Sequence, residues 1–236
     1  MSIACPSFVA GISPSLCSAV DHYCERTSGS LDAEPVNALT NLAFLVGALM
    51  AWRLAGDREQ LENRGLIRGL IMTMAAVGLG SMLFHTVGTR WAEWGDVIPI
   101  LVFMLLYLWL VLTVCFGWPA WLKTAALAGF FAVTFYLEAA VPGSVLWGGA
   151  LYLPTVLALV VIGAALRLRK SRAAGAMFAA TGVFLVSFAA RTLDAPLCSA
   201  FPLGTHFLWH LLNALVLYML VRAAIRGMAG SGAVPG

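Results

Sequence analysis

The chain has 236 residues, of which 61% are hydrophobic and 11% are charged. A soluble domain of this length carries about a quarter charged residues, so the composition excludes an ordinary soluble fold and indicates a membrane protein. The net charge of +3 is small, and the basic residues are scattered between apolar runs, which argues against a nucleic-acid-binding surface.

Residues 1–35 form a segment that is polar enough to be structured outside the lipid. Clustered carboxylates on such a segment can bind calcium. They can equally belong to an ordinary solvated segment, because their spacing is not that of an EF-hand loop. Both alternatives stay open for its four carboxylates, Asp21, Glu25, Asp32 and Glu34.

Seven apolar runs follow, each long enough to cross a bilayer, which takes about 20 mostly apolar residues. The connections between them are short, so residues 36–226 are expected to form one compact bundle of neighbouring antiparallel helices. Residues 227–236 are expected to form a flexible tail. The predicted fold class is therefore an all-α, seven-transmembrane helix bundle. The runs lie near residues 36–54, 66–88, 97–116, 119–138, 145–166, 174–192 and 204–225.

The basic residues indicate how the bundle is oriented across the membrane, because cytoplasmic loops of membrane proteins are enriched in Lys and Arg. Of the 14 such residues, only Arg26, Arg90 and Arg191 fall on one side of the predicted bundle. We therefore expect the N-terminus outside and the C-terminus in the cytoplasm. Alanine-rich spans and the lack of a glycosylation sequon favour a bacterial inner membrane. The residues on the other side are Arg53, Arg58, Arg64, Arg68, Lys123, Arg167, Arg169, Lys170, Arg172, Arg222 and Arg226.

The second span carries Ser81 and His85 on one face, near its predicted outer end. A neutral imidazole is a good metal ligand and an unfavourable lipid-facing group, so its place in the apolar run AAVGLGSMLFH needs a reason. The Ser81 hydroxyl, one turn deeper, could donate a hydrogen bond to a developing oxyanion. It could equally be a small residue that allows close helix packing.

The third span opens near Asp96, again on the predicted outer side. A carboxylate at this level could take a proton from a metal-activated water and later return it. The alternative is a helix cap, because Asp is favoured at helix N-termini and Pro99 suits a first turn. The two roles are compatible. Glu93 is a weaker candidate, which we expect in a solvated loop.

The seventh span begins with His206 and His210, four residues apart and therefore on one helix face. Because the second span runs outward and the seventh runs inward, topology brings both residues to the depth of His85. Three histidines with an open fourth position for water form a catalytic zinc pattern. The alternative is that each histidine packs or hydrogen-bonds singly between helices. The shared depth favours the zinc site.

Four of the five cysteines fall on the predicted outer side, where an oxidising exterior permits disulfides. Sequence alone does not fix their pairing. These four are Cys5, Cys17, Cys24 and Cys198, and the fifth, Cys115, lies inside a span.

Three blocks of the sequence resemble the alkaline ceramidase family, part of a wider group of seven-span membrane hydrolases that includes adiponectin-receptor-like proteins. DHYCERTSGSLDAEPVNALTNLAF resembles the family's N-terminal Asp-Trp-Cys-Glu segment and its entry to the first span. GSMLFHTVGTRWAEWGDVIPI resembles its Ser-x-x-x-His followed by an Asp eleven residues later. GTHFLWHLLNALVLYML resembles its closing His-x-x-x-His helix. The middle spans match only in hydrophobicity.

The resemblance implies roles for five residues. His85, His206 and His210 would bind zinc. Ser81 would help to polarise an amide carbonyl, and Asp96 would serve the attacking water.

The resemblance also implies two features of the N-terminal segment. One is a Cys24–Cys198 disulfide that ties this segment to the last outer loop. The other is a calcium site with Asp21, Glu25 and Glu34 as ligands. In this chain Asp21 stands one residue further from Cys24 than in the family pattern.

The function that the resemblance implies is zinc-dependent hydrolysis of a membrane lipid. The substrate would be ceramide or a related N-acyl lipid, and the products a fatty acid and a long-chain amino alcohol. The bundle would then enclose an apolar pocket for acyl chains that opens sideways to lipid. A seven-transmembrane receptor or sensor with a structural metal is the alternative. A transporter is disfavoured, because the polar candidates gather near the outer edge and not at the midplane. No pattern in the chain indicates its oligomeric state.

Overall fold

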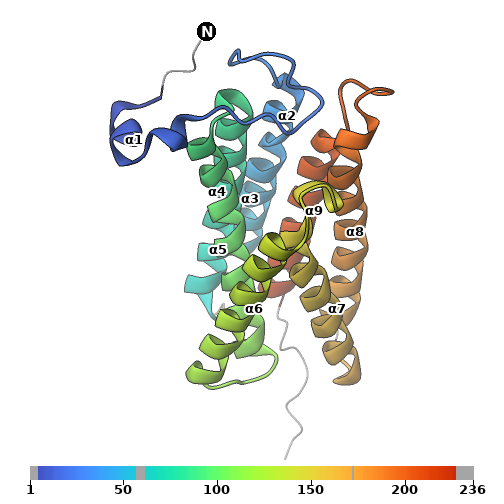
Figure 1. The fold of residues 1–236 in the computed structure, drawn as a ribbon. Coiled ribbons are helices and arrows are strands. Elements are labelled where there is room, and N and C mark those ends of the chain that lie inside the picture. Colours follow the sequence, from blue (N-terminus) through green and yellow to red (C-terminus); the bar gives the residue numbers. More distant parts are fainter. Residues whose placement is uncertain (1–4, 57–61, 172, 227–236) are drawn as a thin grey trace, which may run out of the picture.

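The computed structural model describes residues 5–56, 62–171 and 173–226 (Figure 1). Within this part of the chain the regular elements are helices, apart from one isolated bridge between Ala19 and Thr89. Seven helical stretches, of 19 to 25 residues, are long and apolar enough to cross a membrane. The predicted seven-transmembrane fold class is confirmed, and the chain is an integral, multi-pass membrane protein. The tail predicted over 227–236 lies outside the described residues.

The observed helices overlap all seven predicted runs. The first span consists of two helices separated by a turn at Asn41, and two short 3-10 turns precede the fifth span. The elements are α1 (Ser7–Ile12), η1 (Pro14–Cys17), α2 (Pro35–Thr40), α3 (Leu42–Ala55), α4 (Arg64–Val87), α5 (Arg90–Val114), α6 (Ala120–Ala140), η2 (Leu146–Gly148), η3 (Ala150–Tyr152), α7 (Leu153–Leu168), α8 (Ala173–Leu197) and α9 (His206–Ile225).

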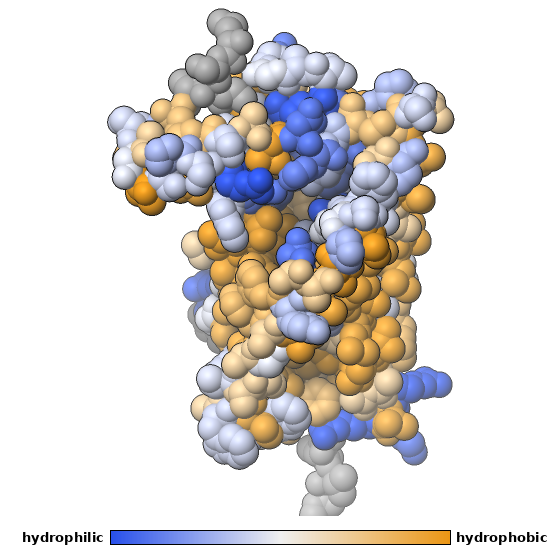
Figure 2. Space-filling view, in the orientation of Figure 1, coloured by the Kyte–Doolittle hydropathy of each residue, from blue (hydrophilic) through white to orange (hydrophobic). Residues whose placement is uncertain are grey.

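The outer surface of the bundle is largely apolar. On the face seen in Figure 2, apolar surface covers the middle of the bundle, and polar surface gathers at the end that carries the N-terminal segment. Large apolar side chains of three different spans, such as Val46, Leu79 and Leu157, are exposed. Such a surface suits lipid, in which a helix satisfies its own backbone and presents apolar side chains outward.

The first two spans and the last span lie side by side in the bundle. Helices α3, α4 and α9 pack against one another, and α8 packs against both α7 and α9. Large side chains such as Phe44, Met74 and Met177, each at most 1% exposed, fill the core between them. Helix α6 is the least buried span and leans across the front of the bundle in Figure 1. The last turn of α4 therefore lies beside the first turns of α9.

The N-terminal segment lies across the end of the bundle where α4 ends and α9 begins, which we call the capped end. Backbone hydrogen bonds attach it to the turn between α4 and α5. The amide of Val20 donates to the carbonyl of Gly88 at 2.9 Å, and the amide of Arg90 donates to the carbonyl of Ser18 at 3.0 Å. These bonds hold the segment over the ends of the spans.

Two disulfides also order this segment. Cys24 is bonded to Cys198 after the end of α8, which confirms the pairing that the resemblance implies. Cys5 is bonded to Cys17, a pairing that the sequence left open. The second bridge closes an arm that contains α1 and projects beside the bundle in Figure 1.

Helix α5 begins earlier than the sequence predicted, at Arg90 and not near residue 97. Its first turn is held by packing, since Ala92 is fully buried. Asp96 therefore lies in the second turn of the helix, and the helix-cap alternative for it is wrong. Glu93 was expected in a loop, but it lies in the first turn and pairs with Arg90 at 2.6 Å.

Helices α4 and α5 approach closely at two glycines. A methyl group at Gly80 would overlap the carbonyl oxygen of Gly95. That carbonyl has no helical donor, because Pro99, four residues later, lacks an N–H. The close approach sets Ser81, next to Gly80, beside Asp96, next to Gly95.

Candidate metal centre

Three histidines converge at the capped end. His85 lies in the last turn of α4, and His206 and His210 lie in the first two turns of α9. All three are at most 2% exposed, and one ring nitrogen of each lies within 4.8 Å of the other two. Within the described residues one other group has this spacing, but it includes Cys24 and Cys198, whose sulfurs are already bonded to each other.

Each histidine has one buried ring nitrogen without a hydrogen-bond partner. These atoms are His85 Nε2, His206 Nδ1 and His210 Nε2. A buried polar atom without a partner is rare in folded proteins, because its desolvation is not offset. Three such lone pairs in one cluster suit a cation, and three histidines are the ligand set of a zinc site with one open position. The residues present therefore fit zinc.

Two of the histidines are oriented through their other nitrogen. His85 Nδ1 lies 2.6 Å from Glu34 Oε2, and His210 Nδ1 lies 3.0 Å from Thr40 Oγ1. The Thr40 hydroxyl donates to the carbonyl of Val36 at 2.8 Å, so it accepts from His210. Such contacts set the tautomer and the direction of a metal-binding imidazole, leaving the second nitrogen for the metal.

Glu34 is a buried carboxylate with three side-chain partners. Its Oε1 accepts from Arg26 Nε, and its Oε2 accepts from Asn37 Nδ2 at 3.1 Å and contacts His85. Burial raises the pKa of Glu34, but the hydrogen bond and charge of His85, together with the charge of Arg26, hold that pKa below its usual range. Glu34 is therefore an ionised partner for His85.

The carboxylates predicted to bind calcium are separated by their contacts. Glu25 accepts from the amide of Val36 at 2.7 Å and from the amide of Asn37 at 2.8 Å, at the start of α2. Glu34 is engaged by Arg26, Asn37 and His85, and Asp21 is exposed. None of the three belongs to a described group whose ligand atoms lie within reach of one ion. In this arrangement they do not fit a calcium site.

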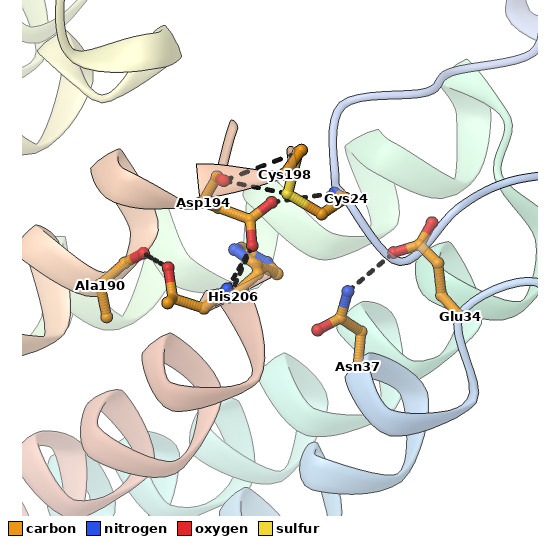
Figure 3. The surroundings of a disulfide bond; sticks show 8 residues. Cys24, Glu34, Asn37, Ala190, Asp194, Cys198 and His206 are labelled. Carbon is orange, nitrogen blue, oxygen red and sulfur yellow. Dashed lines mark hydrogen bonds between the residues drawn. A yellow bond between two sulfur atoms is a disulfide. The ribbon is translucent and has the colours of Figure 1, made fainter. Parts of the chain in front are cut away.

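Asp194, near the end of α8, is a buried carboxylate that positions the start of α9 (Figure 3). Its Oδ1 accepts from the amides of Thr205 and His206 at 2.6 and 2.9 Å, and its Oδ2 accepts from the amide of Cys24 at 3.0 Å. Gly204, at φ +71°, makes room for it, because a side chain there would overlap the carboxylate. Asp194 thus ties together the end of α8, the N-terminal segment and the start of the helix that carries His206 and His210.

Ser81 and Asp96 meet at the contact between α4 and α5. They share a side-chain hydrogen bond, and the Asp96 carboxylate lies close to His85. Ser81 is buried on the face of α4 that carries His85. A hydroxyl and a carboxylate therefore lie next to the histidine cluster.

A polar cavity opens beside the histidines. It measures about 1200 Å³ including its open mouth, and its walls include Asp96, Tyr152, Arg191 and His206. Arg191 donates to the carbonyl of Trp147 at 3.0 Å and lies over the ring of Tyr152. This cavity gives water and a polar head group access to the cluster.

A second, deeper cavity, which measures about 680 Å³ including its open mouth, lies between α5, α6, α7, α8 and α9. Its walls are almost wholly apolar and include Phe103, Leu159, Phe184 and Leu217. Tyr152 lines both cavities, so they are neighbours with this side chain between them. The deeper cavity agrees with the apolar pocket expected for acyl chains.

Four residues of the site were missed by reasoning from the sequence. Asp194 carried a signal, since a carboxylate in the apolar run LVSFAARTLDAPL is a candidate functional residue. Arg26 was used only to orient the bundle, and Thr40 has no distinguishing pattern. Tyr23 also has no distinguishing pattern, although its ring stacks on that of His206 with the ring centroids 3.7 Å apart. Burial raises the pKa of Tyr23, so it covers the cluster as a neutral phenol.

The family model described as Ceramidase matches residues 17–228, which include every residue of the histidine cluster and its partners. A search of curated proteins finds no match.

Proposed function

The chain belongs to the ceramidase family, and from this premise we propose that it is a zinc-dependent hydrolase working inside the membrane. Family membership makes it a hydrolase of the amide bond in ceramide. The zinc ion, the roles of single residues and the extension to related N-acyl lipids are our proposal. The products would be a fatty acid and a long-chain amino alcohol.

One observation carries the proposal of zinc: three buried histidine nitrogens without partners lie in one cluster. His85, His206 and His210 would hold the ion. When bound, zinc would activate a water molecule for attack and polarise the amide carbonyl. A receptor with a structural metal would need the same ligands, but it would not need a carboxylate and a cavity beside them.

We assign the proton transfers to Asp96. Its carboxylate lines the polar cavity beside His206 and lies close to His85. It would accept a proton from the attacking water and deliver it to the departing amine, as a general base and then a general acid. Ser81 donates its one hydroxyl proton to Asp96 in the resting site; once Asp96 has taken the proton of the water, that hydroxyl would turn and donate to the former carbonyl oxygen as negative charge develops there.

The two neighbouring cavities support a lipid substrate. The head group and amide would lie in the polar cavity, and one hydrocarbon chain would pass Tyr152 into the apolar cavity. A third hollow between α5 and α6 shares Val97 and Glu138 with the polar cavity and includes Trp94 and Phe135. This hollow would let the substrate enter sideways from the bilayer.

The side of the membrane on which the site lies is part of the proposal. Among the described residues, basic side chains such as Arg64, Arg167 and Arg226 lie at the ends of spans opposite the histidines, which supports an outward-facing site and a cytoplasmic C-terminus. The alanine-rich spans support a bacterial inner membrane.

The proposal is tested with purified protein. We expect about one zinc ion per chain by metal analysis and release of fatty acid from ceramides. The His206→Ala/His210→Ala double variant should lose both. His22→Ala, which changes the one other histidine, should retain zinc. Zinc without turnover of any N-acyl lipid would favour the receptor, and unchanged turnover in the double variant would rule out the mechanism.

A further inference from the structure

A positively charged side chain, that of Arg26, lies between the predicted calcium ligands and the histidine cluster. Arg26 is only 7% exposed, although it belongs to a segment whose neighbouring residues are mostly exposed. Its Nε donates to Glu34 Oε1, and its Nη2 donates to the carbonyl of His85 at 2.8 Å. One guanidinium thus contacts both the carboxylate that orients His85 and the backbone of His85 itself.

The backbone makes room for this guanidinium at Gly88, which ends α4. A Cβ built at Gly88 would lie 2.6 Å from Arg26 Cζ, and the residue adopts φ +61°, a conformation that favours glycine. The end of α4 is therefore shaped around the arginine side chain. Arg26 is part of the built site and not a chance surface contact.

The carboxylates around Arg26 have few free oxygen lone pairs left to bind a metal ion. Both oxygens of Glu34 and both oxygens of Glu25 already accept hydrogen bonds. A divalent ion beside the guanidinium would be repelled by a fixed charge in surroundings of low dielectric constant. Asp21, the third predicted ligand, is exposed and could not offset this alone.

We propose that Arg26 is a positioning residue that takes the place of calcium in this chain and holds Glu34 against His85. A guanidinium suits this role, because its planar fork can donate to a carboxylate and a carbonyl at once and it stays charged at every physiological pH. The proposal rests on the proposed zinc hydrolase. It predicts an enzyme whose zinc affinity and turnover do not depend on calcium.

The first experiment uses the wild-type protein loaded with zinc. Buffers are freed of calcium with a chelating resin, because soluble chelators would also remove zinc. Turnover of a ceramide and the melting temperature are then measured with and without about 5 mM calcium, enough to fill even weak extracellular sites. We expect both to be unchanged and calcium to be absent from metal analysis. Stoichiometric calcium, or a turnover that requires it, would overturn the proposal.

The second experiment removes the guanidinium. Arg26→Ala should weaken zinc binding and turnover by about 10- to 100-fold, the usual effect of losing a partner of a metal ligand. Methylguanidinium added to this variant should restore both in a saturable way, and Arg26→Lys should retain more zinc affinity than Arg26→Ala. Arg167→Ala, at an exposed arginine at the far end of α7, is the matched control and should behave as wild type.

The outcomes separate this inference from the proposed function. If wild type binds zinc and cleaves ceramide, and Arg26→Ala does so with unchanged zinc affinity, the positioning role is wrong and the hydrolase stands. Suppose that Arg26→Ala folds, that added methylguanidinium does not restore its zinc affinity, and that Arg26→Lys binds zinc no better than Arg26→Ala. The proposed role of the positive charge is then likewise wrong. If wild type neither binds zinc nor cleaves any N-acyl lipid, the proposed function has failed first.

Discussion

At the scale of single residues, the site depends on buried charges that are fully hydrogen-bonded. Asp194 accepts three backbone N–H groups from two segments, including the first residue of α9. A carboxylate can accept at both oxygens, whereas an amide presents N–H donors on one side. This difference makes Asp194 the residue whose conservative replacement is most informative.

We expect Asp194→Asn to lower the free energy of unfolding by about 2 to 3 kcal/mol, because charge-assisted hydrogen bonds are lost and two donors face each other. For a chain of this size this is a fall of about 5 to 10 °C in melting temperature, measured by circular dichroism in detergent. Asp32→Asn, at an exposed carboxylate, should change the melting temperature by no more than about 2 °C. Equal effects of the two changes would show that Asp194 does not hold the start of α9 in place.

At the scale of helices, the contact between Ser81 and Asp96, the proposed catalytic pair, depends on how closely α4 and α5 approach. Gly80→Ala would push the backbone of α5 away at Gly95 and so separate Ser81 from Asp96. We expect turnover to fall about 100-fold, as for a displacement of about 1 Å at a reacting group, while zinc is retained. Gly182→Ala on α8, where a methyl group meets nothing within 4 Å, is the matched control. Loss of zinc in Gly80→Ala alone would mean that the helix contact serves the metal cluster as well.

The same two helices show what the sequence could and could not predict. The depth of His85, His206 and His210 follows from hydrophobic length and alternating direction, so their convergence was predictable. The start of α5 was not, because Ala92 is held by tertiary packing and not by an N-terminal signal. The contacts of Arg26 and Asp194 also escaped prediction, since they join segments that are far apart in sequence and follow no repeating pattern.

At the scale of the whole molecule, the bundle combines a polar cavity at its capped end with an apolar cavity in its interior. The polar cavity reaches His206, and the apolar cavity extends from Tyr152 toward the opposite end of the spans. If one hydrocarbon chain of the substrate occupies the apolar cavity, its length should determine how much binding energy that cavity supplies. The dependence on chain length therefore tests whether the two cavities act as one substrate site.

Ala158 on α7 lines the apolar cavity, and Ala158→Phe would shorten it. With the long-chain base held constant, we expect kcat/KM for a long N-acyl ceramide to fall about ten-fold relative to a short one, the discrimination that a few methylenes in an apolar pocket allow. Ala164→Phe, the same change at a lipid-facing position of the same helix, should leave this ratio unchanged. A ratio that responds to the length of the base and not to that of the acyl chain would reverse the orientation of the substrate. Because the amide would still lie beside the histidines, the assignment of the reaction would not change.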